Sequence, residues 1–485
     1  MRGPAFSPAA EAQLEVPAPA GKESRAGAGT RVTTAPAFSL VSASIATLGA
    51  PAYLGPVAAF ARFGSGVLSP ARKSLPMSTA GPPAREGEPS SALILVLAFA
   101  TGALVANLYY AQPLIAAIAS DLGLQPGMAG AVASVTQIGY GVGLFLIVSL
   151  ADLVESRRLA LATLGLTTIG LVGAALSTSA TPFFIAAAMI GLFSSGAQVL
   201  LPFIAHFAAD ARRGRVIGKV MAGLLTGIML SRPIALFIAA SFGWRAVFWA
   251  SAVVMIGVAA LLARMMPPYR PRARMHYGQI LASTVGMLAR FPEVRWRALY
   301  HGLMFMAFNL FWTTAPLMLA QRLHLGGREI GLFALAGAGG ALAAPVAGKL
   351  ADHGRGELIT GVAMAALGLG FLASGWAAAA GSLGALVVLA VVIDAAVQAN
   401  QIAGQRIIFA VPAEMRGRVN AIYMTLVFVG GALGSFLGAL IYTAGGWSLV
   451  AIVGGLIGAV LLAAFALQHL TAARSQAAEQ RAVSN

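Results

Sequence analysis

The sequence predicts an all-α membrane protein with twelve transmembrane helices, arranged as two pseudo-symmetric halves of six, and with both termini in the cytoplasm. Three observations predict this fold class: the composition, an internal repeat and the distribution of basic residues. Of 485 residues, 58% are hydrophobic and only 10% are charged, whereas charged residues make up about a quarter of a soluble domain. Such a chain belongs in a lipid bilayer.

Apolar stretches of the length needed to cross the hydrocarbon core, about 20 residues, recur through most of the chain. They are continuous and rich in Leu, Ala and Gly, without the alternation of a β-barrel, so we expect helices. The predicted spans are 92–118, 128–150, 159–177, 182–206, 215–241, 245–263, 297–321, 329–350, 357–377, 383–408, 417–442 and 447–467.

The second half of the chain repeats polar landmarks of the first half. The sequence RGRV at 213–216 recurs at 416–419, and GW at 243–244 recurs at 446–447, so both pairs give the same offset, 416 − 213 = 203. Two related halves in a hydrophobic chain are typical of transporters whose halves rock about a central site.

The formal net charge of +16 comes from basic residues in alternate loops. Arg and Lys follow the even-numbered spans, and the opposite loops carry few of them, with Arg245, Arg322 and Arg328 as exceptions. The positive-inside rule therefore places the termini and the central loop in the cytoplasm. This pattern argues against nucleic acid as a partner. The chain has no cysteine, which excludes disulfides and thiolate metal sites.

Composition shifts divide the chain into five predicted parts. These are a disordered or misassigned N-terminal extension at 1–90, a six-helix half at 91–264, a basic cytoplasmic linker at 265–295, a second six-helix half at 296–470 and a cytoplasmic tail at 471–485. The apolar piece at 37–61 is also compatible with a further span or a targeting segment. We expect residues 1–76 to be dispensable for activity. Within the linker, residues 279–288 have helical spacing and could lie along the membrane surface.

Two loops carry matching acidic and basic residues. The sequence GKLADHGR at 348–355 contains Gly348, Asp352, Gly354 and Arg355, and the loop after span 2 reads VSLADLVESRR at 148–158. A loop carboxylate can bond to a helix N-terminus and to arginine, which would favour a closed cytoplasmic side. The predicted gating residues of the earlier loop are Asp152, Arg157 and Arg158.

The segment GKLADHGR resembles the loop signature of the major facilitator superfamily, and ANLYYAQP at 106–113 is similar to a helix 1 motif of its bacterial drug and metabolite:proton antiporters. The resemblance covers residues 92–470 and implies a transporter with a central cavity lined by helices 1, 4, 7 and 10. The earlier loop departs from the signature, since Val148 and Glu155 replace its glycines. Arg232-Pro233 likewise replaces the Gly-Pro of the family's helix 5 antiporter motif, so that motif does not establish antiport.

Two charged residues lie in the middle of predicted spans, where an uncompensated charge is costly. Asp394, in span 10, is a candidate proton-exchanging group, with a structural carboxyl as the alternative. Arg232, in span 5, has Ser435 as its equivalent in the second half, 435 − 203 = 232. It could pair with Asp394, hold an anionic substrate or stabilise helix 5.

Polar and aromatic residues at mid-span form a predicted substrate cavity around these two charges. Asp394, Gln398 and Gln401 share one helix face by their i, i+4, i+7 spacing, although helix–helix hydrogen bonds are an equal alternative for any one amide. Glycines at 430, 434 and 438 predict close helix packing. The predicted cavity residues are Asn107, Tyr109, Tyr110, Gln112, Gln198, Asn309, Trp312, Gln398 and Gln401.

The leading functional hypothesis is a secondary active transporter of the bacterial inner membrane that exports a small organic molecule by proton antiport. The alternatives are a proton-coupled importer or facilitator of a polar metabolite, and a non-transporting membrane sensor. No nucleotide-binding loop, catalytic constellation or metal cluster is visible, so we expect neither an enzyme nor a cofactor. One chain holds both halves and is expected to function as a monomer.

Overall fold

The computed structural model describes residues 89–271, 275–340, 343–412 and 415–484. The chain divides into two units, Met1–Gly81 and Pro82–Asn485, and all of the described residues belong to the second unit. The predicted extension at 1–90, with its apolar piece at 37–61, therefore lies almost entirely outside the described residues.

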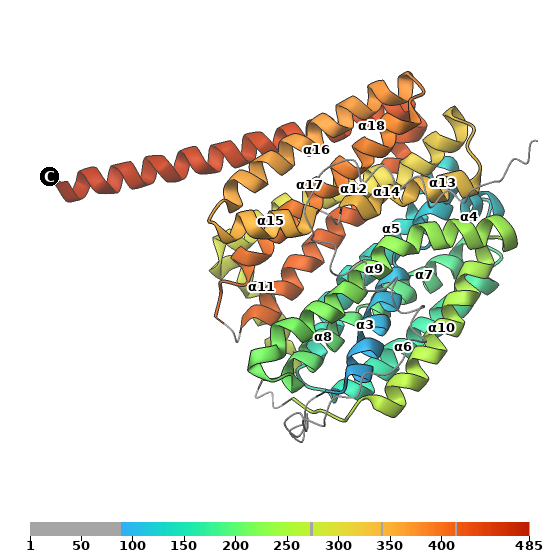
Figure 1. Ribbon diagram of the computed structural model, residues 1–485, viewed down its shortest axis with the longest axis horizontal. Coiled ribbons are helices and arrows are strands. Elements are labelled where there is room, and N and C mark those ends of the chain that lie inside the picture. The colour runs from blue at the N-terminus through green and yellow to red at the C-terminus, as the bar shows by residue number, and fades with distance from the viewer. Residues whose placement is uncertain (1–88, 272–274, 341–342, 413–414, 485) are drawn as a thin grey trace, which may run out of the picture. The chain divides into compact units, whose positions relative to one another are not determined.

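Within the described ranges the chain is helical and contains no strand. The helices run through two successive groups, drawn from blue to yellow-green and from yellow to red in Figure 1. The first group comprises α3 (Ser91–Ala106), η1 (Gln112–Leu114), α4 (Ile115–Asp121), η2 (Pro126–Met128), α5 (Ala131–Leu150), α6 (Ser156–Leu176), α7 (Ala180–Ser194), α8 (Ala197–Phe207), α9 (Asp210–Phe242) and α10 (Trp244–Met265). The second comprises α11 (Tyr277–Arg290), α12 (Pro292–Arg322), α13 (Gly327–Ala334), α14 (Ala336–Gly340), α15 (Ala343–Asp352), α16 (Gly356–Ala379), α17 (Leu383–Ile408) and α18 (Arg416–Ser484).

Each predicted span falls on one helix or on successive helices, and nine helices in the described residues are long and apolar enough to cross a membrane. One of the nine, α18, contains the last two predicted spans. It bends at Gly445 and Gly446, where Gly446 has a φ of +60°, a left-handed conformation that glycine adopts without a steric penalty. The bend lies at the predicted boundary between 442 and 447.

Three predicted spans contain a break in the described residues: the first, the fourth, where Ser195 and Gly196 separate α7 from α8, and the eighth. The first ends its helix at Ala106 and resumes at Gln112, where Pro113, in the first turn, has no N–H to continue a helical ladder. In the eighth, Leu335 separates α13 from α14, and the glycine-rich α14 packs against α17. Discontinuous helices at membrane depth are found where backbone lines a site.

Glycines bring corresponding helices together in each half. Gly102 of α3 lies against the backbone of Gly223 and Gly227 of α9, while Gly302 of α12 lies against Gly430 of α18. An added Cβ at Gly102, Gly223, Gly227 or Gly430 would lie within 2.4 Å of a facing backbone oxygen. The predicted glycine stripe on α18 is therefore confirmed as a close helix contact.

Contacts between the halves run mainly through α5 with α18 and through α9 with α13. The linker helix α11 packs against α5, α12 and α18. On α11, the hydroxyl of Tyr277 donates to the carbonyl of Leu146 at 3.0 Å, and Ser283 accepts from Arg418 at 3.1 Å. The predicted helical spacing in the linker is confirmed, and its helix joins the two halves.

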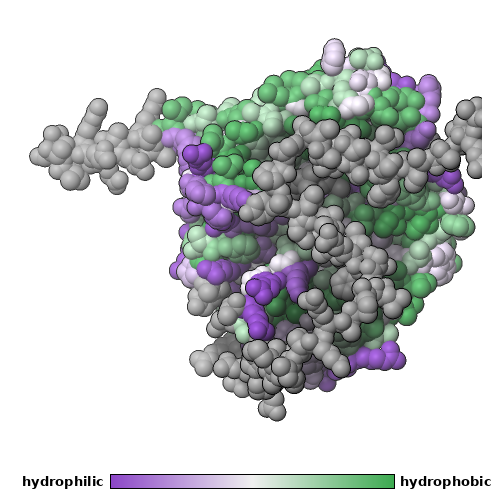
Figure 2. Space-filling view, viewed as in Figure 1, coloured by the Kyte–Doolittle hydropathy of each residue, from purple (hydrophilic) through white to green (hydrophobic). Residues whose placement is uncertain are grey.

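Large apolar side chains cover the outside of the bundle. Leu95 is 65% exposed, Trp376 is 71% exposed, and many other leucines, valines and isoleucines on the spanning helices face outward. Figure 2 shows hydrophobic residues over broad areas of the visible face, with hydrophilic residues in patches at its sides and in its lower part. Exposed apolar area of this extent indicates contact with lipid.

Candidate substrate and proton site

Arg232 lies in the middle of α9 and is only 4% exposed. Its Nε donates to Oε1 of Gln112 at 3.1 Å. Its guanidinium carbon lies 4.9 Å from the ring centre of Tyr109, 5.2 Å from that of Phe308 and 4.9 Å from that of Trp312. The negative faces of the three rings stabilise the buried cation without neutralising it.

Asp394 lies in the middle of α17 and is also 4% exposed. Its Oδ1 accepts a hydrogen bond of 2.7 Å from the indole Nε1 of Trp312. The glycine-rich helix α14 covers the other side of the carboxylate: a Cβ on Gly337 would lie 2.9 Å from Oδ2 and 3.0 Å from the Trp312 ring. The absence of a side chain at Gly337 therefore makes room for the acid.

Trp312 of α12 connects the two charges, because its ring faces Arg232 and its N–H bonds to Asp394. Arg232 and Asp394 attract each other electrostatically, but the described residues show no direct ion pair between them of the kind that joins Arg245 and Asp121 at 2.6 Å. The cation thus belongs to the first half and the anion to the second. The structure brings together the two predicted coupling residues.

Five buried polar side chains form a network between the halves, which we call the amide network. Gln112 Nε2 donates to Asn309 Oδ1 at 3.0 Å and to Thr313 at 3.2 Å. Gln137 Nε2 donates to the same Asn309 oxygen at 2.8 Å and to Ser435 at 3.1 Å. Since Gln112 also bonds to Arg232, the network extends to the charged site.

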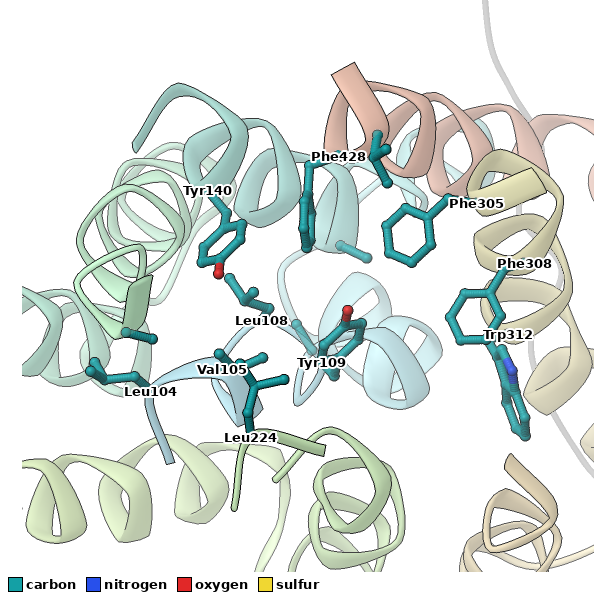
Figure 3. Close-up of a cluster of buried hydrophobic side chains, with 14 of the residues drawn as sticks. Leu104, Val105, Leu108, Tyr109, Tyr140, Leu224, Phe305, Phe308, Trp312 and Phe428 are labelled. Atoms are coloured by element: carbon teal, nitrogen blue, oxygen red, sulfur yellow. The ribbon is translucent and has the colours of Figure 1, made fainter. Parts of the chain in front are cut away.

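Aromatic rings continue from this network along both halves in an arrangement that we call the aromatic row. Tyr140 of the first half lies 4.5 Å from Phe428, measured between ring centres, Phe428 lies 5.2 Å from Phe305, and Phe305 stacks on Phe308 at 5.5 Å. Figure 3 shows these side chains together with Tyr109 and Trp312. The row supplies an apolar surface beside the charges.

The other predicted cavity residues have different surroundings. Asn107 is directed to α10, where its Oδ1 accepts from Ser251 at 2.5 Å and its Nδ2 lies 3.6 Å from the sulfur of Met255. Gln198 donates to the hydroxyl of Tyr140 at 3.2 Å and so reaches the aromatic row. Tyr110, Gln398 and Gln401 are half-buried.

Sequence reasoning missed Gln137, Thr313 and Asn400. Gln137 is an amide in the middle of an apolar span, a signal that could have been used, whereas Thr313 does not stand out among neighbouring hydroxyl residues. Asn400 is 2% exposed on α17, and its Oδ1 has no hydrogen-bond partner among the described residues.

The two predicted gating loops differ in the partners of their acids. Asp152 follows α5 and interacts electrostatically with Arg418 of α18, across the halves; partial burial raises the pKa of its carboxyl, and Arg418 lowers it in part. Asp352 instead forms an ion pair with Arg406 of α17, within its own half. Gly354 has a φ of +75°, as expected of a glycine that follows a helix end.

The remaining predicted gating residues lie around these acids. Arg157 donates to the carbonyl of Ala263, and Arg158 pairs with Glu155 at 3.1 Å. Arg355 directly precedes α16 as its N-cap residue, and Gly348 has open space around its α-carbon.

Arg245, an exception to the charge pattern, is held at the end of the bundle opposite the basic loops. Besides its ion pair with Asp121, it donates to the carbonyl of Ser177 at 2.8 Å. Its charge is therefore balanced locally.

The two helical groups, the lipid-facing surface and the buried charges between the halves define a polytopic membrane transporter. The family model described as Major Facilitator Superfamily matches residues 94–301 and again residues 297–483. The chain belongs to this superfamily. It is therefore a multi-pass membrane protein, in bacteria of the inner membrane, and a transporter of small molecules rather than an enzyme.

Relatives support the same assignment. The chain is 39% identical over 376 residues to "Uncharacterized transporter YgaY" of Escherichia coli O157:H7, which covers 77% of this chain and 95% of the relative. It is 28% identical over 265 residues to "Chloramphenicol resistance protein" of Streptomyces lividans, covering 54% of this chain and 67% of the relative. The crystal structure of the nucleoside transporter NupG has a similar fold, with a TM-score of 0.62 at 14% identity, covering 77% of this chain and 97% of that one.

Proposed function

We propose that this protein is a proton-coupled exporter of a small organic molecule, a drug or a metabolite, that works by alternating access and functions as a monomer. The observation that carries the proposal is the buried pair of opposite charges, Arg232 on the first half and Asp394 on the second, joined by Trp312. Such charges are costly inside a membrane and usually serve transport. The resistance relative named above favours export as the direction.

Asp394 is the proposed proton carrier. When ionised, it attracts Arg232 and accepts from Trp312; when protonated, it carries no charge, and its attraction to Arg232 is lost. A proton arriving from outside would therefore weaken the electrostatic interaction between the halves. Cargo and proton would then occupy the carboxylate alternately, which is the requirement for antiport.

The test uses everted vesicles that contain the wild-type protein or the Asp394→Asn variant. A proton gradient is established, and a pH-sensitive dye follows its collapse as drugs and metabolites are added. We expect cargo-dependent proton release in wild type and none in Asp394→Asn. Glu293→Gln, in the first turn of α12 and far along the helix from Trp312, is the matched control and is expected to behave as wild type.

The amide network favours a second candidate, a proton-coupled importer or facilitator of a polar metabolite, because buried amides suit a cargo with many hydroxyl groups. The two directions are separated by measuring uptake in right-side-out vesicles. Proton-coupled uptake in right-side-out vesicles, without cargo-dependent proton release in everted vesicles, would contradict export and support import. Equal proton release in wild type and Asp394→Asn would remove Asp394 from the coupling.

A further inference from the structure

The charged site has two polar atoms without a hydrogen-bond partner among the described residues, one on each half. Arg232 uses its Nε for Gln112, but its Nη2 is buried and has no hydrogen-bond partner among the described residues. A guanidinium edge of this kind matches an anionic oxygen, and especially a carboxylate. The first position therefore fits the negative end of a ligand.

The second position is on Asp394. Its Oδ1 is occupied by the Trp312 indole, whereas the described residues form no hydrogen bond to Oδ2. The neighbouring helix presents Gly337, which has no side chain, at this oxygen. A carboxylate oxygen in this setting fits an ammonium group.

The two positions are separated by the indole of Trp312, which faces the cation and bonds to the anion. A ligand with one charge would compensate only one of them and would lie close to a buried charge of its own sign. A ligand with both charges compensates both and leaves the net charge of the site unchanged. In a low-dielectric interior, binding without a change in net charge is strongly preferred.

We infer that the cargo is a small zwitterion with an aromatic or apolar body, whose anionic end binds Arg232 and whose ammonium end binds Asp394. The aromatic row, including Phe305 and Phe308, provides the surface for the body. Because the charges belong to different halves, such a cargo also connects the halves, which a singly charged ligand does not. This inference rests on the proposed function for its use of Asp394 and adds the class of cargo.

The test is equilibrium binding to the purified full-length protein by calorimetry, with probes that share one skeleton and differ in charge. L-phenylalanine is the zwitterion, phenylalaninamide the cation and N-acetylphenylalanine the anion; tryptophan and its two derivatives form a second set. We expect the zwitterion of at least one set to bind about tenfold tighter than its singly charged derivatives, a difference of about 1.4 kcal/mol.

Two variants test the two ends of the cargo, one variant for each end. Arg232→Gln is expected to weaken the zwitterion to the level of the cation, and Asp394→Asn to weaken it to the level of the anion. Arg232→Lys, which keeps the charge, should retain a preference for the zwitterion. If Arg232→Gln is poorly folded by gel filtration and circular dichroism, the comparison of probes on wild type and Arg232→Lys still decides.

Several results would overturn the inference: a singly charged probe binding as tightly as its zwitterion, no binding in either set, or equal loss for all probes in each variant. The proposed function and the inferred class of cargo can each fail while the other stands. Zwitterion binding without proton release in vesicles would refute proton antiport alone, whereas proton release driven only by singly charged or neutral cargo would refute the zwitterion alone.

Discussion

Arg232 is buried, and its neighbours offset the desolvation of its charge. Contacts with aromatic faces contribute about 0.5 to 2 kcal/mol each, and a hydrogen bond from a charged group about 1.5 to 3 kcal/mol. Desolvating the ion costs several kcal/mol. The guanidinium has three rings and Gln112, while Nη2 has no partner among the described residues. The burial of Arg232 thus depends on these neighbours and on its attraction to Asp394.

Removing either charge should therefore affect the other. We expect Arg232→Gln and Asp394→Asn each to lower stability, since each leaves a single buried charge, and the double variant to be more stable than the sum of the two changes implies. The interaction energy is expected to be about 1 to 3 kcal/mol. Thermal unfolding of the four proteins in detergent measures it, and strictly additive changes would show that the attraction between the two groups has no energetic consequence.

Asp152 gives a prediction about pH. Its carboxyl has a raised pKa in the folded protein, chiefly because of partial burial, so the folded state binds the proton more tightly than the unfolded state. Its contribution to stability therefore falls as pH rises from its ordinary pKa, 3.8, through the folded value. We expect Asp152→Asn to flatten this part of the stability profile. The effect should be small because the group lies at the surface. Unfolding temperatures of both proteins at several pH values test this, and parallel profiles would contradict it.

At the scale of helices, the sequence identifies which stretches span the membrane, because twenty apolar residues in a row have few alternatives. The interruptions are harder to predict. Residues 335–340 read as ordinary apolar helix, and only the packing of α14 against α17 shows that glycine is required there. The bend at Gly446, by contrast, coincides with a predicted boundary. Gly446 is itself part of the repeated GW sequence at 446–447.

A substitution at Gly337 tests the role of α14. In Gly337→Ala the new methyl group would press on Asp394 and Trp312, so we expect proton release in vesicles to fall at least about tenfold, as for displaced active groups. Gly384→Ala is the matched control: Gly384 is also helical, but it has no atom near its missing side chain. Wild-type transport by Gly337→Ala would show that the acid tolerates displacement.

At the scale of the whole molecule, the internal repeat predicts which helices correspond. The glycine contacts of α3 with α9 and of α12 with α18 join corresponding helices, since Gly227 and Gly430 are 203 residues apart and Gly102 and Gly302 are 200 apart. The offset does not predict contacts between the halves, because these depend on how each helix is rotated. Gln137 donates hydrogen bonds to Asn309 and Ser435 because of how its helix is rotated. The contacts of Trp312 with both predicted coupling residues likewise cannot be predicted from spacing along the chain.

The amide network is expected to stabilise the arrangement of the halves seen in the structure. Gln137→Ala removes two hydrogen bonds between halves, each worth about 1 kcal/mol, and should shift the equilibrium between conformations roughly tenfold or more. The chain contains no cysteine, so pairs of cysteines for spin labels can be introduced without background. One pair, Ser241 with Arg328, reports on the end where α9 meets α13, and a second, Gly218 with Val346, reports on the opposite end.

Distance distributions from paired labels then measure the populations directly. In Gln137→Ala we expect the Ser241–Arg328 distribution to broaden towards longer distances while the Gly218–Val346 distribution shortens, because the halves rotate as units. Gln321→Ala is the control: its hydrogen bond to Tyr442 joins α12 to α18 within one half, so its loss should leave both distributions unchanged. If Gln137→Ala and Gln321→Ala give the same distributions, the network holds side chains in place but does not bias the transport cycle.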